Sequence, residues 1–169
     1  RDGRHLPVEA AVLVGLPAAL GRRDREPVLR LARELVLGDA LLGEPMDLLV
    51  WPEGGVDSDP LNTPATARTL DELVASAEAP LLMNAATARG EDTYNTSMLW
   101  EAGSAEQMHD KVNPVPFGEY VPHRWFYERI VPDLVGLIQR EYTPGTNPPL
   151  VSVDGIQVGL AICFDVIYD

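Results

Sequence analysis

Three residues of this chain could together carry out acyl-group chemistry: Glu53, Lys111 and Cys163. A deprotonated cysteine is a nucleophile, a carboxylate can take its proton, and an ammonium group can stabilise negative charge on oxygen. Among the 13 lysine and arginine residues only Lys111 is a lysine, and Cys163 is the single cysteine. An ammonium is a compact point charge that can approach an oxyanion closely, whereas a guanidinium is a broad planar fork, so Lys111 could have a specific electrostatic role. Composition alone can also produce a single lysine.

Each of these residues also has a structural interpretation. Glu53 follows the apolar run at 48–50 and precedes two glycines, which suits a general base at a strand end but also a solvated loop acid. Lys111 could hold an oxyanion or lower a thiol pKa, or it could be an ordinary surface lysine. Cys163 follows an apolar run, where a free cysteine is often a small buried hydrophobic residue.

Other residues could support such a site. Glu119, in a proline-bounded loop, is predicted to orient Lys111 or a substrate amine, or else to belong to a rigid surface turn. Asn95 could hold a neighbouring loop through its amide, or serve a strand edge. The aromatic cluster Trp125, Phe126 and Tyr127 could contact an apolar substrate or lipid, or pack a helix face.

Composition restricts the function further. The 169 residues are 46% hydrophobic, which predicts one globular domain, and the net charge of −13 argues against nucleic-acid binding. No apolar stretch reaches the ~20 residues that span a bilayer. A single cysteine excludes an internal disulfide and a multi-cysteine zinc site, and the three histidines lack ligand spacing, so no structural metal is expected. No cofactor is predicted.

The pattern of apolar residues and turn signals predicts an α/β domain. Helices are expected at 22–42, from Thr63–Pro64 to Glu78 with a Thr63 side-chain cap, and in broken form around 125–127. Strands are expected at 10–14, 47–51, 80–86, 94–100, 106–109, 150–153 and 156–162. The last two strands flank Asp154-Gly155, a strong hairpin signal. Residues 1–8 are expected to be a frayed lead-in, and 9–169 a domain cut short at its C-terminal side.

Three sequence words, in order, resemble the apolipoprotein N-acyltransferase family of the nitrilase superfamily. They are Tyr94-Asn95-Thr96-Ser97, then Lys111 with Val115-Pro116-Phe117-Gly118-Glu119-Tyr120-Val121-Pro122, and then Ile162-Cys163-Phe164-Asp165. The order of Glu53, Lys111 and Cys163 is that of the superfamily's Glu–Lys–Cys triad. This resemblance covers residues 9–169, and the proline-bounded word at 115–122 is its most specific part.

The resemblance implies a nitrilase-like α-β-β-α sandwich, here truncated. It implies that Cys163 takes a fatty acyl chain from a phospholipid as a thioester and passes it to the N-terminal amine of an apolipoprotein. Glu53 would be the general base and acid, and Lys111 would stabilise the oxyanion together with the backbone N–H after Cys163. The domain would lie on the extracytoplasmic face of a bacterial cell membrane, held there by segments outside this chain.

The resemblance also implies supporting or substrate-binding roles for Glu119, Asn95, Phe164 and Asp165. At Asp165 the family often has glutamate, and at Asn113 it usually has an apolar residue. Two other functions remain open at this stage. One is a soluble nitrilase-like amidase that hydrolyses a small amide with the same triad, and the other is a binding domain without catalysis in which Cys163 is a core residue.

Overall fold

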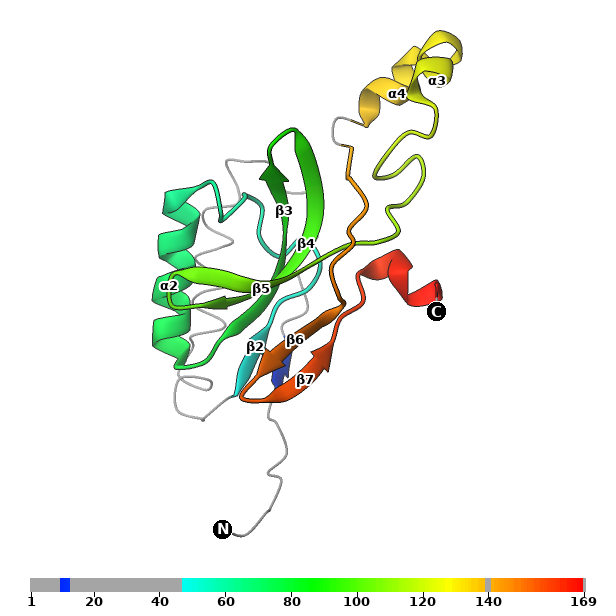
Figure 1. Cartoon of the computed structure of the whole chain (residues 1–169). Coiled ribbons are helices and arrows are strands. Elements are labelled where there is room, and N and C mark those ends of the chain that lie inside the picture. The colour runs from blue at the N-terminus through cyan, green and yellow to red at the C-terminus, as the bar shows by residue number, and fades with distance from the viewer. Residues whose placement is uncertain (1–9, 13–46, 139–140, 169) are drawn as a thin grey trace.

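A computed structural model of the chain describes residues 10–12, 47–138 and 141–168. Within these residues a five-stranded sheet and a two-stranded hairpin form an α/β domain, which confirms the predicted fold class (Figure 1). The larger sheet follows chain order: β1 Ala10–Val12, β2 Leu48–Val50, β3 Leu81–Arg89, β4 Asp92–Glu101 and β5 Ser104–Asp110. The predicted lead-in at 1–8 and helix at 22–42 lie outside the described residues.

The directions of these strands bring distant parts of the chain to one edge of the sheet. Strands β1, β2 and β3 are parallel, and β4 is antiparallel to both β3 and β5. The carboxyl ends of β2, β3 and β5 therefore point the same way, and the start of β4 lies beside them. Residues that directly follow β2 and β5 consequently meet at this edge.

Helix α2, Pro64–Ala77, covers one face of the sheet. Its buried residues Leu70, Leu73 and Val74 recur with the spacing of a single helical face, and Pro64 occupies the first turn. Thr63 precedes the helix but makes no side-chain capping hydrogen bond, so the predicted cap is wrong. Burial of the apolar face against the sheet, rather than a cap, positions this helix.

The opposite face of the sheet is covered by the hairpin of β6, Leu150–Val153, and β7, Ile156–Gly159 (Figure 1). Val151 and Val153 join Leu48, Leu82 and Leu99 in a second apolar cluster. The side-chain amide of Gln107 on β5 pairs with the backbone N–H and carbonyl of Ser152 at 2.6 and 2.9 Å. Helix, sheet and hairpin are thus three consecutive layers in the order that the α-β-β-α sandwich predicts.

The β6–β7 turn forms as the sequence predicts, but β7 is shorter than expected. Asp154 and Gly155 both have positive φ, 48° and 81°, which is the conformation that a two-residue hairpin turn requires. The predicted strand at 156–162 ends at Gly159. Residues 160–162 then lead into a short 3₁₀ helix, η1, over Cys163–Ile167. This earlier end of the strand leaves Cys163 at the start of a turn.

Helices α3, Arg124–Ile130, and α4, Pro132–Leu137, form an arm that projects from the sheet (Figure 1). They confirm the predicted broken helix around 125–127, because Pro132 starts a second helix after the first one ends. The arm exposes large apolar side chains, among them Trp125, Phe126, Ile130 and Leu137. No helix in the described part of the chain has both the length and the apolar character needed to cross a bilayer.

A crossing segment at 142–147 lies against the end of β5. Gly145 donates its N–H to the carbonyl oxygen of Lys111 at 2.8 Å, and the Asn147 side chain bonds the backbone of Met108 and Asp110. A Cβ atom on Gly145 would lie 2.1 Å from the Asp110 carbonyl oxygen, so only glycine fits here without a shift of the backbone. The segment therefore packs tightly over the residues just before and at Lys111.

We predict that Gly145→Ala lowers the free energy of unfolding by about 1–3 kcal/mol, the usual cost of overpacking. Thermal and urea unfolding of the intact protein measure this effect. Gly159→Ala is the matched control, because no atom lies within 4 Å of a Cβ built at Gly159. Equal stability of the two variants would contradict the tight packing at Gly145.

Candidate active site

Four of the residues predicted for the site, Glu53, Asn95, Lys111 and Glu119, are in mutual contact at the shared edge of the sheet. Glu53 lies three residues after β2, and Lys111 directly follows β5. Asn95 lies near the start of β4, on the face that also carries Asn84, because Asn84 pairs with Ser97 and side chains alternate along strands. The sheet edge thereby gathers the carboxylate of Glu53, the amides of Asn84 and Asn95 and the ammonium of Lys111, which come from segments far apart in sequence.

The loop that carries Glu53 is fixed along β3 by its backbone. The N–H groups of Trp51 and Val56 bond the carbonyl oxygens of Leu82 and Asn84 at 2.8 and 3.1 Å. Between them Gly54 donates its N–H to Asn84 Oδ1 at 2.8 Å and has a φ of 68°, which favours glycine. Glu53 is thus held by a rigid loop while its side chain stays 39% exposed.

Lys111 is buried, with only 1% of its side chain exposed, so the surface-lysine alternative is wrong. Its Nζ lies 2.8 Å from Glu119 Oε2 and 3.5 Å from Glu53 Oε1. A buried ammonium is unfavourable unless it is paired and hydrogen-bonded, and these two acids supply the pairing. Lys111 is therefore part of a polar cluster, whose other members are Glu53, Asn84, Asn95 and Glu119.

The charges around Lys111 keep it protonated. Burial alone would lower the pKa of this lysine, but the hydrogen bond with Glu119 and the charges of Glu53 and Glu119 outweigh it and raise the pKa above its ordinary value. A thiolate at Cys163 contributes in the same direction. An ammonium that stays charged at neutral pH can stabilise an oxyanion and cannot act as a general base.

Glu119 is the most strongly bonded acid of the cluster. Its Oε2 accepts hydrogen bonds from the Val115 N–H at 2.7 Å and from Lys111, and its Oε1 accepts one from Asn95 Nδ2 at 3.0 Å. Burial acts to raise the pKa of Glu119, but these hydrogen bonds hold it below its usual value. The carboxylate of Glu119 therefore bonds both its own loop, at the Val115 N–H, and Lys111. The two interpretations made from the sequence, a rigid turn and a partner of Lys111, are compatible with each other.

Asn95 connects the two carboxylates. Its Nδ2 donates to Glu53 Oε1 at 2.8 Å and to Glu119 Oε1 at 3.0 Å, and its Oδ1 accepts from Asn84 Nδ2 at 2.7 Å. The amide therefore holds the loop of Glu53 as one sequence interpretation predicted. Sequence reasoning missed Asn84, although an amide in the apolar run Leu81-Leu82-Met83 is a signal, because asparagine is depleted in strands.

Cys163 is exposed, so its interpretation as a buried core residue is wrong. It begins η1 with a φ of 48°, a left-handed conformation that is uncommon for residues other than glycine. Backbone strain of this kind is frequent at functional sites, where the surrounding structure must hold it. The buried Ile162 before it anchors the turn, and the thiol remains accessible.

Asp165 ties the turn of Cys163 to the chain after β5. Its carboxylate accepts hydrogen bonds from the backbone N–H groups of Val112 and Asn113, at 3.2 and 2.7 Å, and from Asn113 Nδ2 at 3.0 Å. The imidazole Nε2 of buried His109 lies 3.9 Å away. The shorter aspartate arm therefore does accept hydrogen bonds here, and Asn113 supplies two of their donors.

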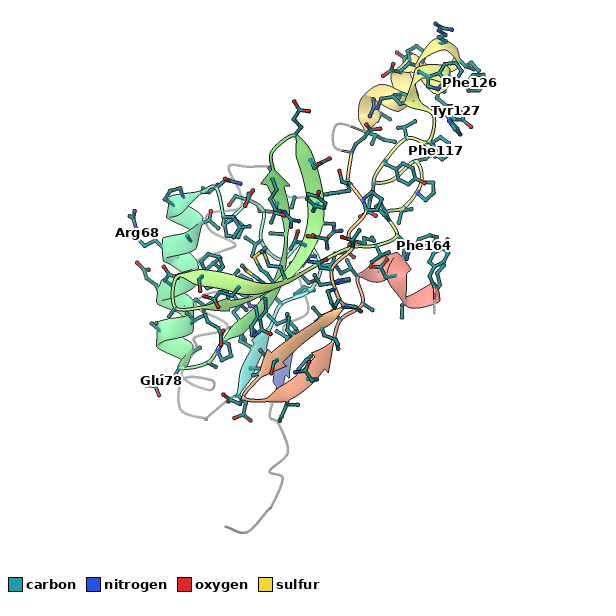
Figure 2. The ribbon with its side chains drawn as sticks, in the orientation of Figure 1. Arg68, Glu78, Phe117, Phe126, Tyr127 and Phe164 are labelled. Atoms are coloured by element: carbon teal, nitrogen blue, oxygen red, sulfur yellow. The ribbon has the colours of Figure 1, made fainter. Side chains whose placement is uncertain are left out.

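Phe164 lies beside a cavity of about 370 Å³ next to the polar cluster. Proline and aromatic side chains dominate its lining, with Tyr120 and Tyr142 on one side and Phe164 and Tyr168 in edge-to-face contact on another. Figure 2 shows Phe164 below the arm that carries Phe126 and Tyr127. An apolar group bound in this cavity would lie next to the residue that follows Cys163.

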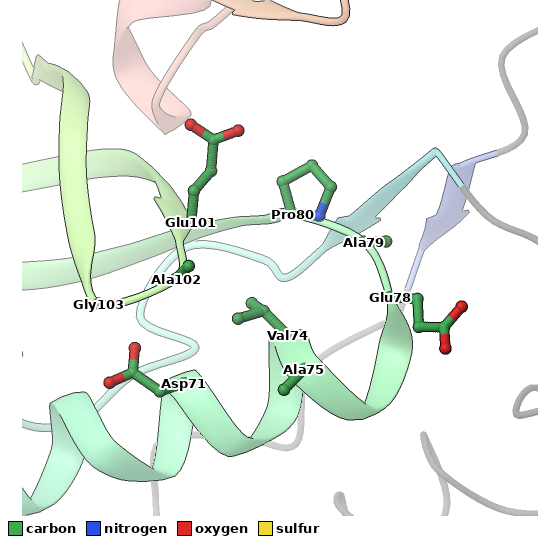
Figure 3. A pocket seen from close by; sticks show the side chains of 9 residues that line it. All are labelled: Asp71, Val74, Ala75, Glu78, Ala79, Pro80, Glu101, Ala102 and Gly103. Carbon is green, nitrogen blue, oxygen red and sulfur yellow. The ribbon is translucent and has the colours of Figure 1, made fainter.

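A second pocket, of about 520 Å³, lies at the other end of β4 from Asn95 (Figure 3). It is formed by the C-terminal part of α2, the link between α2 and β3, and the β4–β5 turn, with Asp71, Glu78 and Glu101 among its lining residues. It shares no residue with the polar cluster. Within the described residues no group of three histidine, cysteine or acidic side chains could hold a metal ion.

The carbon-nitrogen hydrolase family model matches residues 10–169, so this chain belongs to that family. The apolipoprotein N-acyltransferase of Mycolicibacterium smegmatis (strain ATCC 700084 / mc(2)155) is 32% identical over 151 residues, which are 83% of this chain and 24% of that protein. The family resemblance seen in the sequence is confirmed. The chain spans about a quarter of the length of this relative.

Solved structures agree with the fold. A carbon-nitrogen hydrolase from Helicobacter pylori G27 superposes with a TM-score of 0.59 at 17% identity, over 94% of this chain and 52% of that one. An amidase from Nesterenkonia sp. AN1, with acrylamide added at its active-site cysteine, gives a TM-score of 0.57 at 18% identity, over 93% and 57%. At these identities the likeness establishes the shared fold alone.

The Lys111–Glu119 pair predicts a pH-dependent stability. The lowered pKa of Glu119 stabilises the fold above the ordinary carboxyl value of 4.5, and this contribution is lost as pH falls through the folded value. The raised pKa of Lys111 stabilises it below the ordinary value of 10.5, and this is lost at higher pH. Glu119→Gln should therefore lower the free energy of unfolding by about 2 kcal/mol near neutral pH.

Urea unfolding of wild type and Glu119→Gln across the acid range measures this difference, which should shrink as Glu119 becomes protonated. Glu106→Gln serves as the control, because Glu106 is an exposed acid of β5 that takes no part in the contacts of Lys111 and Glu119. A wild-type advantage that stays constant down to strongly acid pH would contradict the paired, ionised state of Glu119.

Proposed function

We propose that this chain contains the catalytic domain of an apolipoprotein N-acyltransferase, spanning residues 9–169. The observation that carries the proposal is an exposed, strained Cys163 whose charge as a thiolate acts on the buried ammonium of Lys111, together with the two acids that pair with that ammonium. The 32% identity over 83% of the chain to an apolipoprotein N-acyltransferase supports this choice of reaction within the family.

In the first step Glu53 takes the proton of the Cys163 thiol, and the sulfur attacks the carbonyl carbon of a phospholipid ester. The Lys111 ammonium and the backbone N–H of Phe164 stabilise the oxyanion of the tetrahedral intermediate. The carbon–oxygen ester bond then breaks, Glu53 returns its proton to the leaving alkoxide, and a lysophospholipid departs. The fatty acyl chain stays on Cys163 as a thioester.

In the second step the N-terminal amine of an apolipoprotein attacks the thioester carbonyl. Glu53 removes a proton from the attacking amine, the oxyanion forms again beside Lys111, and the carbon–sulfur bond breaks. The products are an N-acylated lipoprotein and the Cys163 thiol, which regains its proton from Glu53. The two steps need no cofactor.

The different hydrogen bonds and exposures of Glu119 and Glu53 support these roles. Glu119 accepts hydrogen bonds from three groups and has a lowered pKa, so it holds Lys111 and remains ionised. Glu53 lies farther from Lys111 and is more exposed, with 39% of its side chain accessible against 16% for Glu119. Of the two carboxylates, Glu53 is therefore the better one for exchanging protons with a substrate.

The surroundings of the site support a lipid donor. The cavity next to Phe164 is lined largely by proline and aromatic side chains, and the α3–α4 arm exposes Trp125, Phe126, Ile130 and Leu137. Exposed apolar groups of this size suit contact with a membrane or an acyl chain. On this proposal the domain acts at the extracytoplasmic face of a bacterial cell membrane, and other segments of the protein supply the anchor.

We predict that incubation of the intact protein with phospholipid vesicles adds the mass of one fatty acyl chain. Hydroxylamine should remove the added mass, because it cleaves thioesters, and Cys163→Ala should never acquire it. Intact-protein mass spectrometry measures all three results. Absence of an adduct on folded wild-type protein, together with hydrolysis of a small amide such as propionamide, would instead identify the amidase alternative.

A further inference from the structure

A directed chain of hydrogen bonds runs beneath the site. The backbone N–H of Gly54 donates to Asn84 Oδ1 at 2.8 Å, and Asn84 Nδ2 donates to Asn95 Oδ1 at 2.7 Å. Asn95 Nδ2 then donates to both Glu53 and Glu119, at 2.8 and 3.0 Å. Every donor in this relay points from the loop toward the two carboxylates.

The direction of the relay is dictated by the chemistry of its ends. A backbone N–H can only donate, and an ionised carboxylate can only accept. If the Asn84 amide were reversed, its Nδ2 would face the Gly54 N–H and its Oδ1 would face Asn95 Oδ1, which places like groups together twice. The two amides therefore have one joint orientation that satisfies all of their partners.

We infer that Asn84, which lies outside the proposed Glu–Lys–Cys triad, is a positioning residue that orients the Asn95 amide and through it the Glu53 carboxylate. This inference rests on the proposed function, since it assigns Glu53 the role of base. Asn84 and Asn95 are only 4% and 6% exposed. Burial of two amides in a strand pair is unfavourable unless each is bonded, and the relay bonds both.

The relay also separates the two acids. Asn95 gives one hydrogen to each carboxylate, while Lys111 lies closer to Glu119 than to Glu53. Glu53 Oε1 is fixed by Asn95, and Glu53 Oε2 receives no hydrogen bond from the described part of the chain. One oxygen of Glu53 is thus anchored, and the other remains available for proton exchange with Cys163.

The titratable groups around Glu53 come from three segments. Lys111 directly follows β5, and His109 lies two residues before it on the same face of the sheet. Glu119 belongs to the loop at 113–122, and Cys163 is the first residue of η1. Asn95 donates a hydrogen bond to Glu53, so loss of that donor should change proton exchange between Glu53 and Cys163. The relay is therefore expected to affect how the reactivity of Cys163 varies with pH.

Asn84→Asp tests the relay in the intact protein. The new carboxylate can still accept from the Gly54 N–H, so the loop stays bonded, but it cannot donate to Asn95 Oδ1. The Asn95 amide then turns its Nδ2 toward the new carboxylate and its Oδ1 toward Glu53. The rate of alkylation of Cys163 by iodoacetamide, measured as a function of pH, falls on the acid side of its profile; this acid limb should move to higher pH by about one unit in the variant. Thioester formation should slow by about 100-fold.

Two further variants separate positioning from other effects. Asn84→Ala adds no charge and should move the acid limb in the same direction, even if Asn84→Asp fails to fold. Ser97→Ala removes only a 3.4 Å contact with Asn84 and should stay within about twofold of wild type in alkylation rate. Melting temperatures identify any variant whose loss of reactivity comes from unfolding.

The two readouts distinguish the two proposals. An acid limb that stays in place in folded Asn84→Asp and Asn84→Ala would overturn the positioning role, whether or not the wild type forms a thioester. A displaced limb without any acyl adduct on wild type would support the relay and contradict the acyltransferase. A displaced limb together with an adduct that forms more slowly in the variants would support both.

Discussion

The buried ammonium of Lys111 is the constraint on which the site depends. A charge with 1% of its side chain exposed must be paired, and Glu119 provides both the pairing and a loop that is fixed by the same carboxylate. Glu119 bonds both Lys111 and the Val115 N–H, whereas Glu53 is the more exposed of the two acids and lies farther from Lys111. The difference in exposure between the two carboxylates thus accompanies the difference in their distances from Lys111.

The sheet makes this arrangement possible because its strand directions bring the ends of β2 and β5 to one edge. The crossing segment at 142–147 then covers the end of β5, where Gly145 allows a backbone approach that any side chain would prevent. Asp165 bonds the backbone of Val112 and Asn113 and so joins the turn of Cys163 to the residues after Lys111. The strained backbone at Cys163 is held between this contact and the buried Ile162.

Sequence patterns predicted most elements of the described part, because local signals are strong there. Alternating and continuous apolar runs located β2 to β6, Pro64 marked the start of α2, and Asp154-Gly155 marked the hairpin. Predictions were less accurate where tertiary packing determines how a helix or strand begins or ends. Thr63 makes no capping bond, and β7 ends at Gly159 instead of continuing to Ile162.

By itself the sequence determined the family and the residue types of the site, because the words around Lys111 and Cys163 and the order Glu53, Lys111, Cys163 are properties of the chain alone. Only the tertiary structure decided that Lys111 is buried, that Cys163 is exposed, and that Asn84 and Asn95 link the two acids. Burial and pairing arise from contacts between segments that lie far apart in sequence. No local pattern encodes them, since the free energy of a buried charge or amide depends on every group that surrounds it.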